Sequence, residues 1–205
     1  VVISVGNIVA GGTGKTPFVK MLADHFAKRK VAILSRGYGK IADEAMMLQR
    51  NLPHVPIYVG KDRRATASQA VKDGALLILL DDGFQHRKLH RDLDIVLVCG
   101  EGPLGKGHYL PWGFLRHSPK RLKDADAVFL KGKDFRYVPF CSSSLQGRKE
   151  GLFAGITNPS FFKKSLCDLG GEVVAEWILA DHEVPDPKDL NRFAARSKAL
   201  GASAL

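Results

Sequence analysis

A glycine-rich segment near the start of the chain carries residue types that bind phosphate. It reads Gly11-Gly12-Thr13-Gly14-Lys15-Thr16 and lies between an apolar run and a helical pattern, which is the context of a P-loop. In such a loop, backbone N–H groups surround phosphate oxygens, the lysine reaches the β- and γ-phosphates, and the threonine hydroxyl binds Mg²⁺. The predicted ATP-binding residues are Val9, Ala10, Gly11, Gly12, Thr13, Gly14, Lys15 and Thr16. Val9 stands where the usual pattern has glycine, and a glycine-rich turn without a ligand is the alternative.

Two adjacent aspartates form a second candidate site. Asp81 and Asp82 directly follow the apolar run Leu76–Leu80, and an acidic residue at the end of a buried strand is the arrangement that holds Mg²⁺ opposite a P-loop threonine. Neighbouring carboxylates also repel each other unless a cation lies between them. We therefore predict a metal site formed by Thr16, Asp81 and Asp82, and it stays open which aspartate contacts the metal. The alternative is a pair that only forms a turn or caps a helix.

Phosphoryl transfer to a hydroxyl also needs charge neutralisation and often a base. Asp43-Glu44 follows a polar stretch after the second apolar run, and Asp181-His182 follows the run Val173–Leu179. Asp and His from these separate segments could form a dyad. The alternatives are that Asp-Glu at the start of a helix is a cap, which is more often the case, and that Asp-His is structural. Arg63 and Arg116 are candidate phosphate clamps, and solvated surface arginines are the alternative.

The elements that would position these residues alternate between strands and helices. The expected strands are 1–5, 31–34, 57–59, 76–80, 94–98 and 127–130, and the expected helices are 17–28 and 65–72. Continuous apolar strands are typical of a parallel sheet covered on both faces. We therefore predict an α/β fold, P-loop NTPase-like, with a mostly parallel sheet and helices on both faces. In helix 17–28 the spacing of apolar residues predicts a buried face, made of Phe18, Met21, Leu22 and Phe26.

A polar, irregular stretch over 132–149 interrupts this alternation. We therefore predict a P-loop ATP-binding kinase domain over 1–135, a linker over 136–149 and a smaller C-terminal α/β unit over 150–205. In the smaller unit, strands are expected at 152–156 and 173–179, and helices near 161–169 and 186–200.

Composition narrows the class of protein. The formal net charge is +10 at pH 7, which suits an anionic partner, although a hydrated basic surface is the alternative. The three cysteines form no C-x-x-C pair, so we expect a reducing cytoplasm and neither a disulfide framework nor a structural zinc site. No apolar run is long enough to span a bilayer, and the abrupt ends of the sequence suggest a piece of a longer chain.

Taken together, these stretches resemble the tetraacyldisaccharide 4'-kinase family of lipid A biosynthesis. The similarity runs through nearly the whole chain, and its most specific blocks are Ser35-Arg36-Gly37-Tyr38-Gly39 and Asp81-Asp82-Gly83-Phe84-Gln85-His86. It also includes Val5-Gly6-Asn7, Gly60-Lys61-Asp62-Arg63, Gly105, Gly107, Leu110-Pro111, Arg116 and Ala180-Asp181-His182. Four features differ from the family. Its N-terminal hydrophobic helix is absent, and the spacer between Gly39 and Asp43 is shorter than usual. The segment Glu183-Val184-Pro185 is unusual, and the family normally continues past Leu205.

The resemblance implies a reaction and roles for several residues. The reaction is ATP- and Mg²⁺-dependent phosphorylation of the 4'-hydroxyl of a tetraacylated glucosamine disaccharide 1-phosphate, a lipid A precursor. Asp43 would be the catalytic base and His182 its dyad partner. The supporting residues would be Glu44, Arg63, His86 and Arg116. The family also implies a peripheral location at the cytoplasmic face of the bacterial inner membrane, an anionic membrane surface that suits a basic protein.

Two other classes of protein are alternatives. P-loop ATPase switches of the partitioning or metal-insertion kind share Gly-Lys-Thr, but they usually carry a lysine just before the first glycine pair, where this chain has Ala10. A nucleic-acid-binding module would suit the positive charge. The Lys and Arg residues are scattered, however, without an RRM-type motif, so we expect no nucleic-acid partner.

Overall fold

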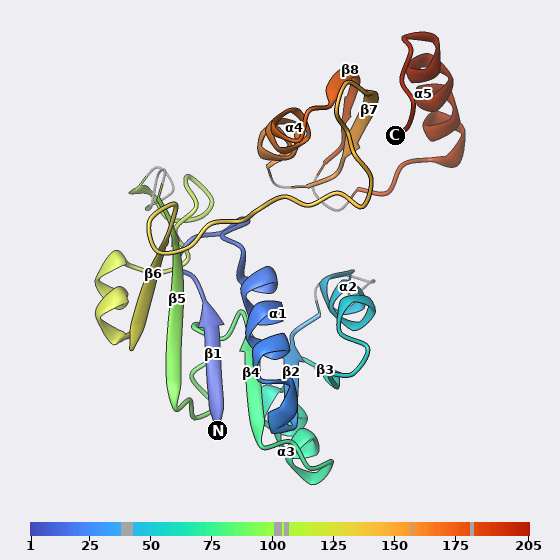
Figure 1. The fold of residues 1–205 in the computed structure, drawn as a ribbon. Coiled ribbons are helices and arrows are strands. Elements are labelled where there is room, and N and C mark those ends of the chain that lie inside the picture. Colours follow the sequence, from blue (N-terminus) through green and yellow to red (C-terminus); the bar gives the residue numbers. More distant parts are fainter. Residues whose placement is uncertain (38–42, 101–103, 105–106, 157, 181–182) are drawn as a thin grey trace. The chain divides into compact units, whose positions relative to one another are not determined.

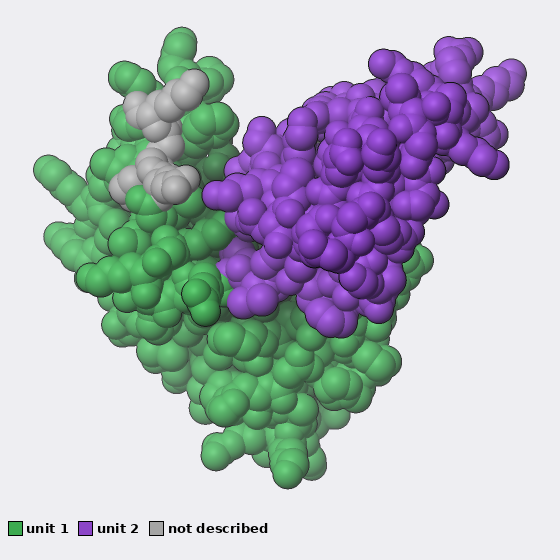
Figure 2. Space-filling model, turned by 45° about the horizontal axis from the view of Figure 1, so that its top comes forward, with its two compact units in different colours: residues 1–136 green, residues 137–205 purple. Residues whose placement is uncertain are grey.

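The computed structural model describes residues 1–37, 43–100, 104, 107–156, 158–180 and 183–205, and for Asp43 and Glu44 it describes the backbone only. These residues divide into two compact units, Val1–Arg136 and Tyr137–Leu205, which Figure 2 shows in different colours. The first unit holds the glycine-rich segment and both aspartates of the candidate metal site.

Among the described residues, a six-stranded sheet forms the centre of the first unit (Figure 1). Its strands are β1 (Val2–Gly6), β2 (Val31–Ser35), β3 (Ile57–Val59), β4 (Leu77–Asp81), β5 (Leu93–Cys99) and β6 (Ala127–Lys131). Their order is β3-β2-β4-β1-β5-β6, and every pairing of neighbours is parallel. Strands β2 and β4 are buried along their whole length, as expected of strands that are covered on both faces. The predicted α/β class is confirmed.

Helices cover both faces of this sheet. They are α1 (Lys15–His25), the short 3₁₀ helices η1 (Ala27–Arg29) and η3 (Pro119–Asp124), α2 (Asp43–Asn51) and α3 (Arg63–Lys72). One apolar layer contains Val19 of α1, Leu48 of α2 and Ile33 of β2. The other contains Ala67 of α3 and Leu34 of β2. Because successive side chains of a strand point to opposite faces, the neighbours in β2 belong to different layers, and α1 and α2 lie opposite α3.

The buried side of helix α1 differs from the prediction at one position. Val19 and Ala23 are its fully buried apolar residues, and Phe18 and Leu22 pack beside them while partly exposed. Met21, which was expected on the buried face, is 52% exposed. Successive residues of a helix are rotated by about 100°, so a residue midway between 19 and 23 points away from the sheet.

The second unit is a small α/β layer. Strands β7 (Lys149–Ala154) and β8 (Glu172–Ile178) pair in parallel, and helices α4 (Pro159–Asp168) and α5 (Pro187–Ala199) pack against them. Both helices begin with a proline preceded by a capping side chain, Asn158 or Asp186, which is a strong start signal for a helix. Helix α5 joins the layer through Trp177 and Phe193, whose ring centroids are 5.6 Å apart.

Candidate active site

The glycine-rich segment lies where strand β1 leads into helix α1. Strand β1 ends at Gly6, and α1 begins at Lys15 after Gly14, whose φ of 84° is left-handed. No side chain caps α1, and its first turn holds no acidic residue. The first N–H groups of a helix lack partners within the helix and carry partial positive charge, so this terminus is suited to an anion. Within the segment, the Thr13 N–H donates to the carbonyl oxygen of Gly11 (2.9 Å).

Asn7 holds this segment in place. It is fully buried, and its Nδ2 donates to Oγ1 of Thr13 (2.9 Å). Its backbone oxygen accepts from Nε2 of Gln85 (2.7 Å), and its Oδ1 accepts from Nη1 of Arg116 (3.2 Å). Buried amides are destabilising unless they are hydrogen-bonded, so these bonds fix the start of the segment. Neither Asn7 nor Gln85 is among the site residues predicted above, although a polar residue directly after an apolar strand is a signal that could have marked Asn7.

Residues 107–116, which we call the aromatic loop, run beside the start of the glycine-rich segment. The Ala10 N–H donates to the carbonyl oxygen of Phe114 (2.6 Å), and Val9 forms an isolated antiparallel bridge with Leu115. Val9 and Ala10 are both predicted ATP contacts. The Ala10 N–H would have to leave the Phe114 carbonyl before it could donate to a phosphate.

The two aspartates lie at the carboxyl end of β4, beside the glycine-rich segment. Asp81 is the last residue of β4, is 3% exposed and pairs in register with Val5 of β1. Asp82 follows with a φ of 54°, a left-handed conformation that aspartate adopts more readily than most residues. The turn packs tightly on β1, because a Cβ at Gly6 would lie 2.4 Å from Cβ of Phe84. Glycine is therefore required at the end of β1.

Two cationic side chains hold Asp82. Arg116 binds it in bidentate fashion, with Nη1 donating to Oδ1 (2.8 Å) and Nη2 to Oδ2 (3.0 Å). Nζ of Lys15 lies 3.6 Å from Oδ1. Burial alone would raise the pKa of Asp82, but the hydrogen bond from Arg116 and the charges of Lys15, Arg116 and Arg63 outweigh burial, so the pKa lies below its ordinary value. Three predicted site residues from separate parts of the chain thus meet at one point.

Arg63 lies inside the protein and joins two strand ends. It is 3% exposed, and it donates from Nη1 to the carbonyl oxygen of Leu34 (2.7 Å) and from Nη2 to that of Asp81 (3.0 Å). The N-terminus of α3 presents it, and Asp62 caps this helix by accepting from the Arg64 N–H (3.0 Å). The alternative of a solvated surface arginine is wrong for Arg63, whose described contacts fix the carboxyl ends of β2 and β4.

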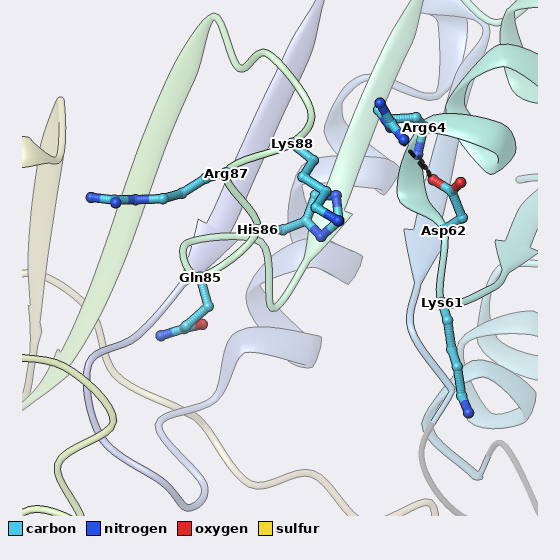
Figure 3. Close-up of a pocket in the computed structure, with 7 residues that line it drawn as sticks. All are labelled: Lys61, Asp62, Arg64, Gln85, His86, Arg87 and Lys88. Atoms are coloured by element: carbon cyan, nitrogen blue, oxygen red, sulfur yellow. Dashed lines mark hydrogen bonds and ion pairs between the residues drawn. The ribbon is translucent and has the colours of Figure 1, made fainter.

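A basic groove lies beside this edge of the sheet, between the segment that precedes α3 and the loop that follows β4 (Figure 3). Its cavity volume is about 510 Å³, and its lining residues are Lys61, Asp62, Arg64, Gln85, His86, Arg87 and Lys88. Figure 3 shows His86 and Lys88 on the side that faces Arg64, whereas Arg87 points the other way. Burial lowers the pKa of His86, and the charges of nearby arginines lower it further. The positive charge of the groove at pH 7 therefore comes from its Lys and Arg side chains.

The predicted catalytic pair is not described. Asp181 and His182 lie outside the described residues, and of Asp43 and Glu44 only the backbone is described. Asp43 is the first residue of α2. The dyad of Asp43 and His182 therefore stays a prediction, as does the supporting role of Glu44.

Comparisons with known proteins agree on one family. The whole chain, residues 1–205, matches the family described as tetraacyldisaccharide-1-P 4'-kinase (LpxK). Tetraacyldisaccharide 4'-kinase of Chlamydia abortus is 36% identical over 245 residues, which cover 95% of this chain and 66% of the relative. The enzyme of that name from Syntrophus aciditrophicus is 36% identical over 270 residues, covering 100% of this chain and 72% of the relative. These relatives favour the kinase over the ATPase switch.

A solved structure is similar throughout most of the chain. The crystal structure of LpxK from Aquifex aeolicus in complex with ATP has 32% sequence identity and a TM-score of 0.74, and the match covers 91% of this chain and 74% of that one. The chain spans about two thirds of the length of the curated relatives it matches. Both matched stretches are longer than the 205 residues of the chain, so the relatives carry internal segments that it lacks. The match over its full length shows that the chain belongs to the tetraacyldisaccharide-1-P 4'-kinase family.

Proposed function

We propose that the chain carries the activity for which its family is named, the transfer of the γ-phosphoryl group of ATP to the 4'-hydroxyl of a tetraacyldisaccharide 1-phosphate. The observation that carries this proposal is the convergence of Lys15, Asp82 and Arg116 beside a glycine-rich turn, at the carboxyl edge of a parallel sheet. Phosphoryl transfer depends mainly on positioning and on neutralising the charge of the transferred group. This edge of the sheet offers both.

ATP would bind along the glycine-rich segment. The N-terminus of α1, which no side chain caps, and the ammonium group of Lys15 are suited to the β- and γ-phosphates. Lys15 lies against Asp82 at 3.6 Å, so binding exchanges this contact for one to phosphate. Asp82 keeps its bidentate partner Arg116 through the exchange, and no buried carboxylate is left without a counter-charge.

The side chains at this edge fit magnesium. The Thr16 hydroxyl and the Asp81 carboxylate both belong to buried residues, and oxygen atoms are the ligands that Mg²⁺ prefers. Within the described ranges, no group of three or more His, Cys, Asp and Glu side chains could hold a metal ion. Mg²⁺ is usually held by one or two carboxylates together with phosphates and water. Bound magnesium would neutralise charge on the β- and γ-phosphates. We assign the direct contact to Asp81, because both carboxylate oxygens of Asp82 accept from Arg116.

Activation of the acceptor hydroxyl is assigned to Asp43 and His182 on the basis of the family resemblance. The 4'-oxygen would attack the γ-phosphorus as the bond to ADP breaks, and the hydroxyl proton would pass to this pair. Support for Asp43 comes from its place at the start of α2, the helix that follows β2. Arg63 links the carboxyl end of β2 to that of β4 by hydrogen bonds. A base at the start of α2 would therefore follow a strand whose end is held in place. Glu44 and His86 would support the pair.

The acceptor's own phosphate gives the basic groove a role. The family's acceptor is a disaccharide 1-phosphate, so it carries an anionic group in addition to the reacting hydroxyl. Lys88 and Arg64 line the groove (Figure 3), while Asp62, its one acidic lining residue, is engaged in capping α3. Cationic side chains around a cavity favour a phosphate group. We therefore assign this groove to the 1-phosphate of the lipid A precursor.

A peripheral location at the cytoplasmic face of the bacterial inner membrane is part of the proposal. The net charge of +10 would favour the anionic lipids of that face, and no nucleic-acid partner is proposed. Among the residues that the structure describes, no helix is both long and apolar enough to cross a bilayer.

The test of the proposed function is transfer of label from γ-labelled ATP, with magnesium, to a tetraacyldisaccharide 1-phosphate in neutral detergent micelles. The wild-type chain should label the lipid, Asp43→Ala should abolish labelling while ATP affinity is kept, and Lys15→Ala should weaken ATP binding itself. Undiminished labelling by Asp43→Ala would remove the base assignment. ATP binding without any labelling would mean that the 205-residue chain lacks a part of the kinase or that the acceptor is different.

A further inference from the structure

The aromatic loop exposes a group of large apolar side chains. The exposed fractions are 84% for Trp112, 53% for Leu110, 52% for Tyr109 and 44% for Phe114. Contiguous exposed apolar groups mark contact with another molecule or with a membrane. Trp and Tyr in particular favour the membrane–water interface, because each combines an apolar ring with one polar group.

Hydrogen bonds within the loop hold this apolar tip in one conformation. The Leu115 N–H donates to the His108 carbonyl (3.0 Å), the Leu110 N–H to the Leu115 carbonyl (3.2 Å), and the Gly113 N–H to the Tyr109 carbonyl (3.0 Å). A Cβ at Gly113 would lie 2.3 Å from the His108 oxygen, so the turn requires glycine there. A tip that is already ordered loses little conformational entropy when it binds.

The base of the loop is anchored in the core beside the glycine-rich segment. Leu115 is 3% exposed, and the Arg116 N–H donates to the carbonyl oxygen of Ile8 (2.8 Å). Leu115 packs in a buried cluster with Ile8, Val9, Phe84, Val96 and Val98. The loop therefore presents its tip outward while its base is continuous with the ATP-binding segment.

Arginine side chains lie near the base of the loop. His117 follows the loop directly, and burial lowers its pKa, as do the neighbouring charges of Arg121, Arg116 and Arg87. Of these three arginines, Arg116 is paired with Asp82 and Arg121 with Asp124 (2.6 Å), so the net positive charge near the base comes from Arg87. An exposed apolar tip close to net positive charge, in a chain whose formal net charge is +10, is the pattern of a segment that binds an anionic lipid interface.

We propose that the aromatic loop inserts its tip into the headgroup region of an anionic bilayer, with Trp112 as the principal anchor. This inference rests on the proposed function, because a tetraacylated acceptor resides in lipid. The loop would bring the glycine-rich segment to the surface that holds the acceptor. The positive charge favours an anionic bilayer as the binding partner, because such a bilayer complements both the apolar tip and the charge near the base. A purely apolar partner would contact only the tip.

The fluorescence of Trp112 tests the insertion directly. The chain contains two tryptophans, so the variant Trp177→Phe leaves Trp112 as the sole reporter. Vesicles of phosphatidylglycerol and phosphatidylcholine, without ATP or acceptor, should shift its emission to the blue, protect it from acrylamide and allow quenching by brominated acyl chains. This assay contains no kinase step. A failure of the proposed kinase function is therefore distinguishable from a failure of the proposed membrane insertion.

Three results would overturn the proposal. Trp112 could remain equally open to acrylamide in protein that has bound to the vesicles, which would place the bound surface elsewhere. The protein could fail to bind anionic vesicles at low salt. Trp112 could already be shielded before vesicles are added, which would mean that the protein itself or a second copy covers the loop.

A variant series gives an independent arm. The double substitution Leu110→Ser with Trp112→Ser should weaken vesicle binding about tenfold, because it removes most of the exposed apolar area of the tip. The matched control is Phe140→Ala, which removes an aromatic side chain that is 89% exposed in the second unit. Equal losses in the double variant and the control, or no loss in the double variant, would contradict the proposal. Unchanged circular dichroism and ATP affinity would show that the fold is intact.

Discussion

Replacing Arg116 with alanine should lower the free energy of unfolding by about 2 kcal/mol. The substitution removes two charge-assisted hydrogen bonds to Asp82 and a longer one to Asn7, and hydrogen bonds to charged groups contribute about 1.5–3 kcal/mol each. The side chains of Arg116 and Asp82 are 21% and 14% exposed, so solvent screening reduces the sum. Lys15 remains beside the carboxylate and offsets part of the loss.

A double-mutant cycle isolates the pair. The second substitution is Asp82→Asn, because asparagine tolerates the left-handed backbone of this position (φ 54°) while alanine does not. Urea unfolding at pH 7 of the wild type, Arg116→Ala, Asp82→Asn and the double variant should give a coupling energy of about 1–2 kcal/mol. Because the pKa of Asp82 lies below its ordinary value of 3.8, this stabilisation is complete above that value and is lost as the pH falls through the lower, folded-state pKa.

The cycle can refute the reasoning in two ways. A coupling energy near zero at pH 7 would mean that Arg116 and Asp82 do not stabilise each other. A coupling that grew as the pH fell toward the pKa of the carboxyl would have the wrong sign for a lowered pKa. Transfer assays on the same proteins should show a loss of kcat for Arg116→Ala and also weaker ATP binding, because Lys15 can then bind phosphate only by giving up its contact with Asp82.

Three other substitutions test separate parts of the site. Gly6→Ala should destabilise the protein by about 3 kcal/mol and abolish transfer, since the added Cβ would lie 2.4 Å from Cβ of Phe84; unfolding near the wild-type urea midpoint would show that the turn can yield. Arg63→Met should lower the free energy of unfolding by about 3 kcal/mol, because two carbonyl groups lose charged donors; a neutral effect in thermal unfolding would contradict its bracing role. Lys88→Ala should raise KM for the acceptor about tenfold at unchanged kcat. The control is Lys72→Ala, which removes an exposed lysine at the far end of α3 and should leave KM unchanged. With an acceptor that lacks the 1-phosphate, the two variants should have the same KM. If the groove binds the acceptor's phosphate, anionic lipid added to the micelles should not restore the difference in KM.

The fold could be predicted because its strongest signals are local. Strand β3 has the predicted bounds, and β2 and β4 differ from prediction by a residue at their ends, because continuous apolar runs have few alternatives to a buried parallel strand. The prediction of the buried side of α1 was less accurate. Met21 fitted the apolar spacing but is exposed, since spacing alone does not show how a helix is rotated against the sheet.

The contacts within the site could not be predicted, because they join residues far apart in the chain. The pairing of Arg116 with Asp82 crosses 34 positions, and the bond from Gln85 to Asn7 crosses 78. Arg63 illustrates the same limit. Its position after a glycine and two charged residues suggests a surface arginine, whereas its guanidinium lies between two strand ends that only the folded sheet brings together.

The central claim is that the chain moves phosphate from ATP to the 4'-hydroxyl of the acceptor, and the most direct measurement is the ³¹P spectrum of the lipid after incubation with ATP and magnesium. We predict a second phosphomonoester resonance, correlated with the proton at the 4' carbon, that grows as ADP accumulates and is missing with Asp43→Ala. Release of ADP and inorganic phosphate with an unchanged lipid spectrum would contradict the claim and would identify an ATPase.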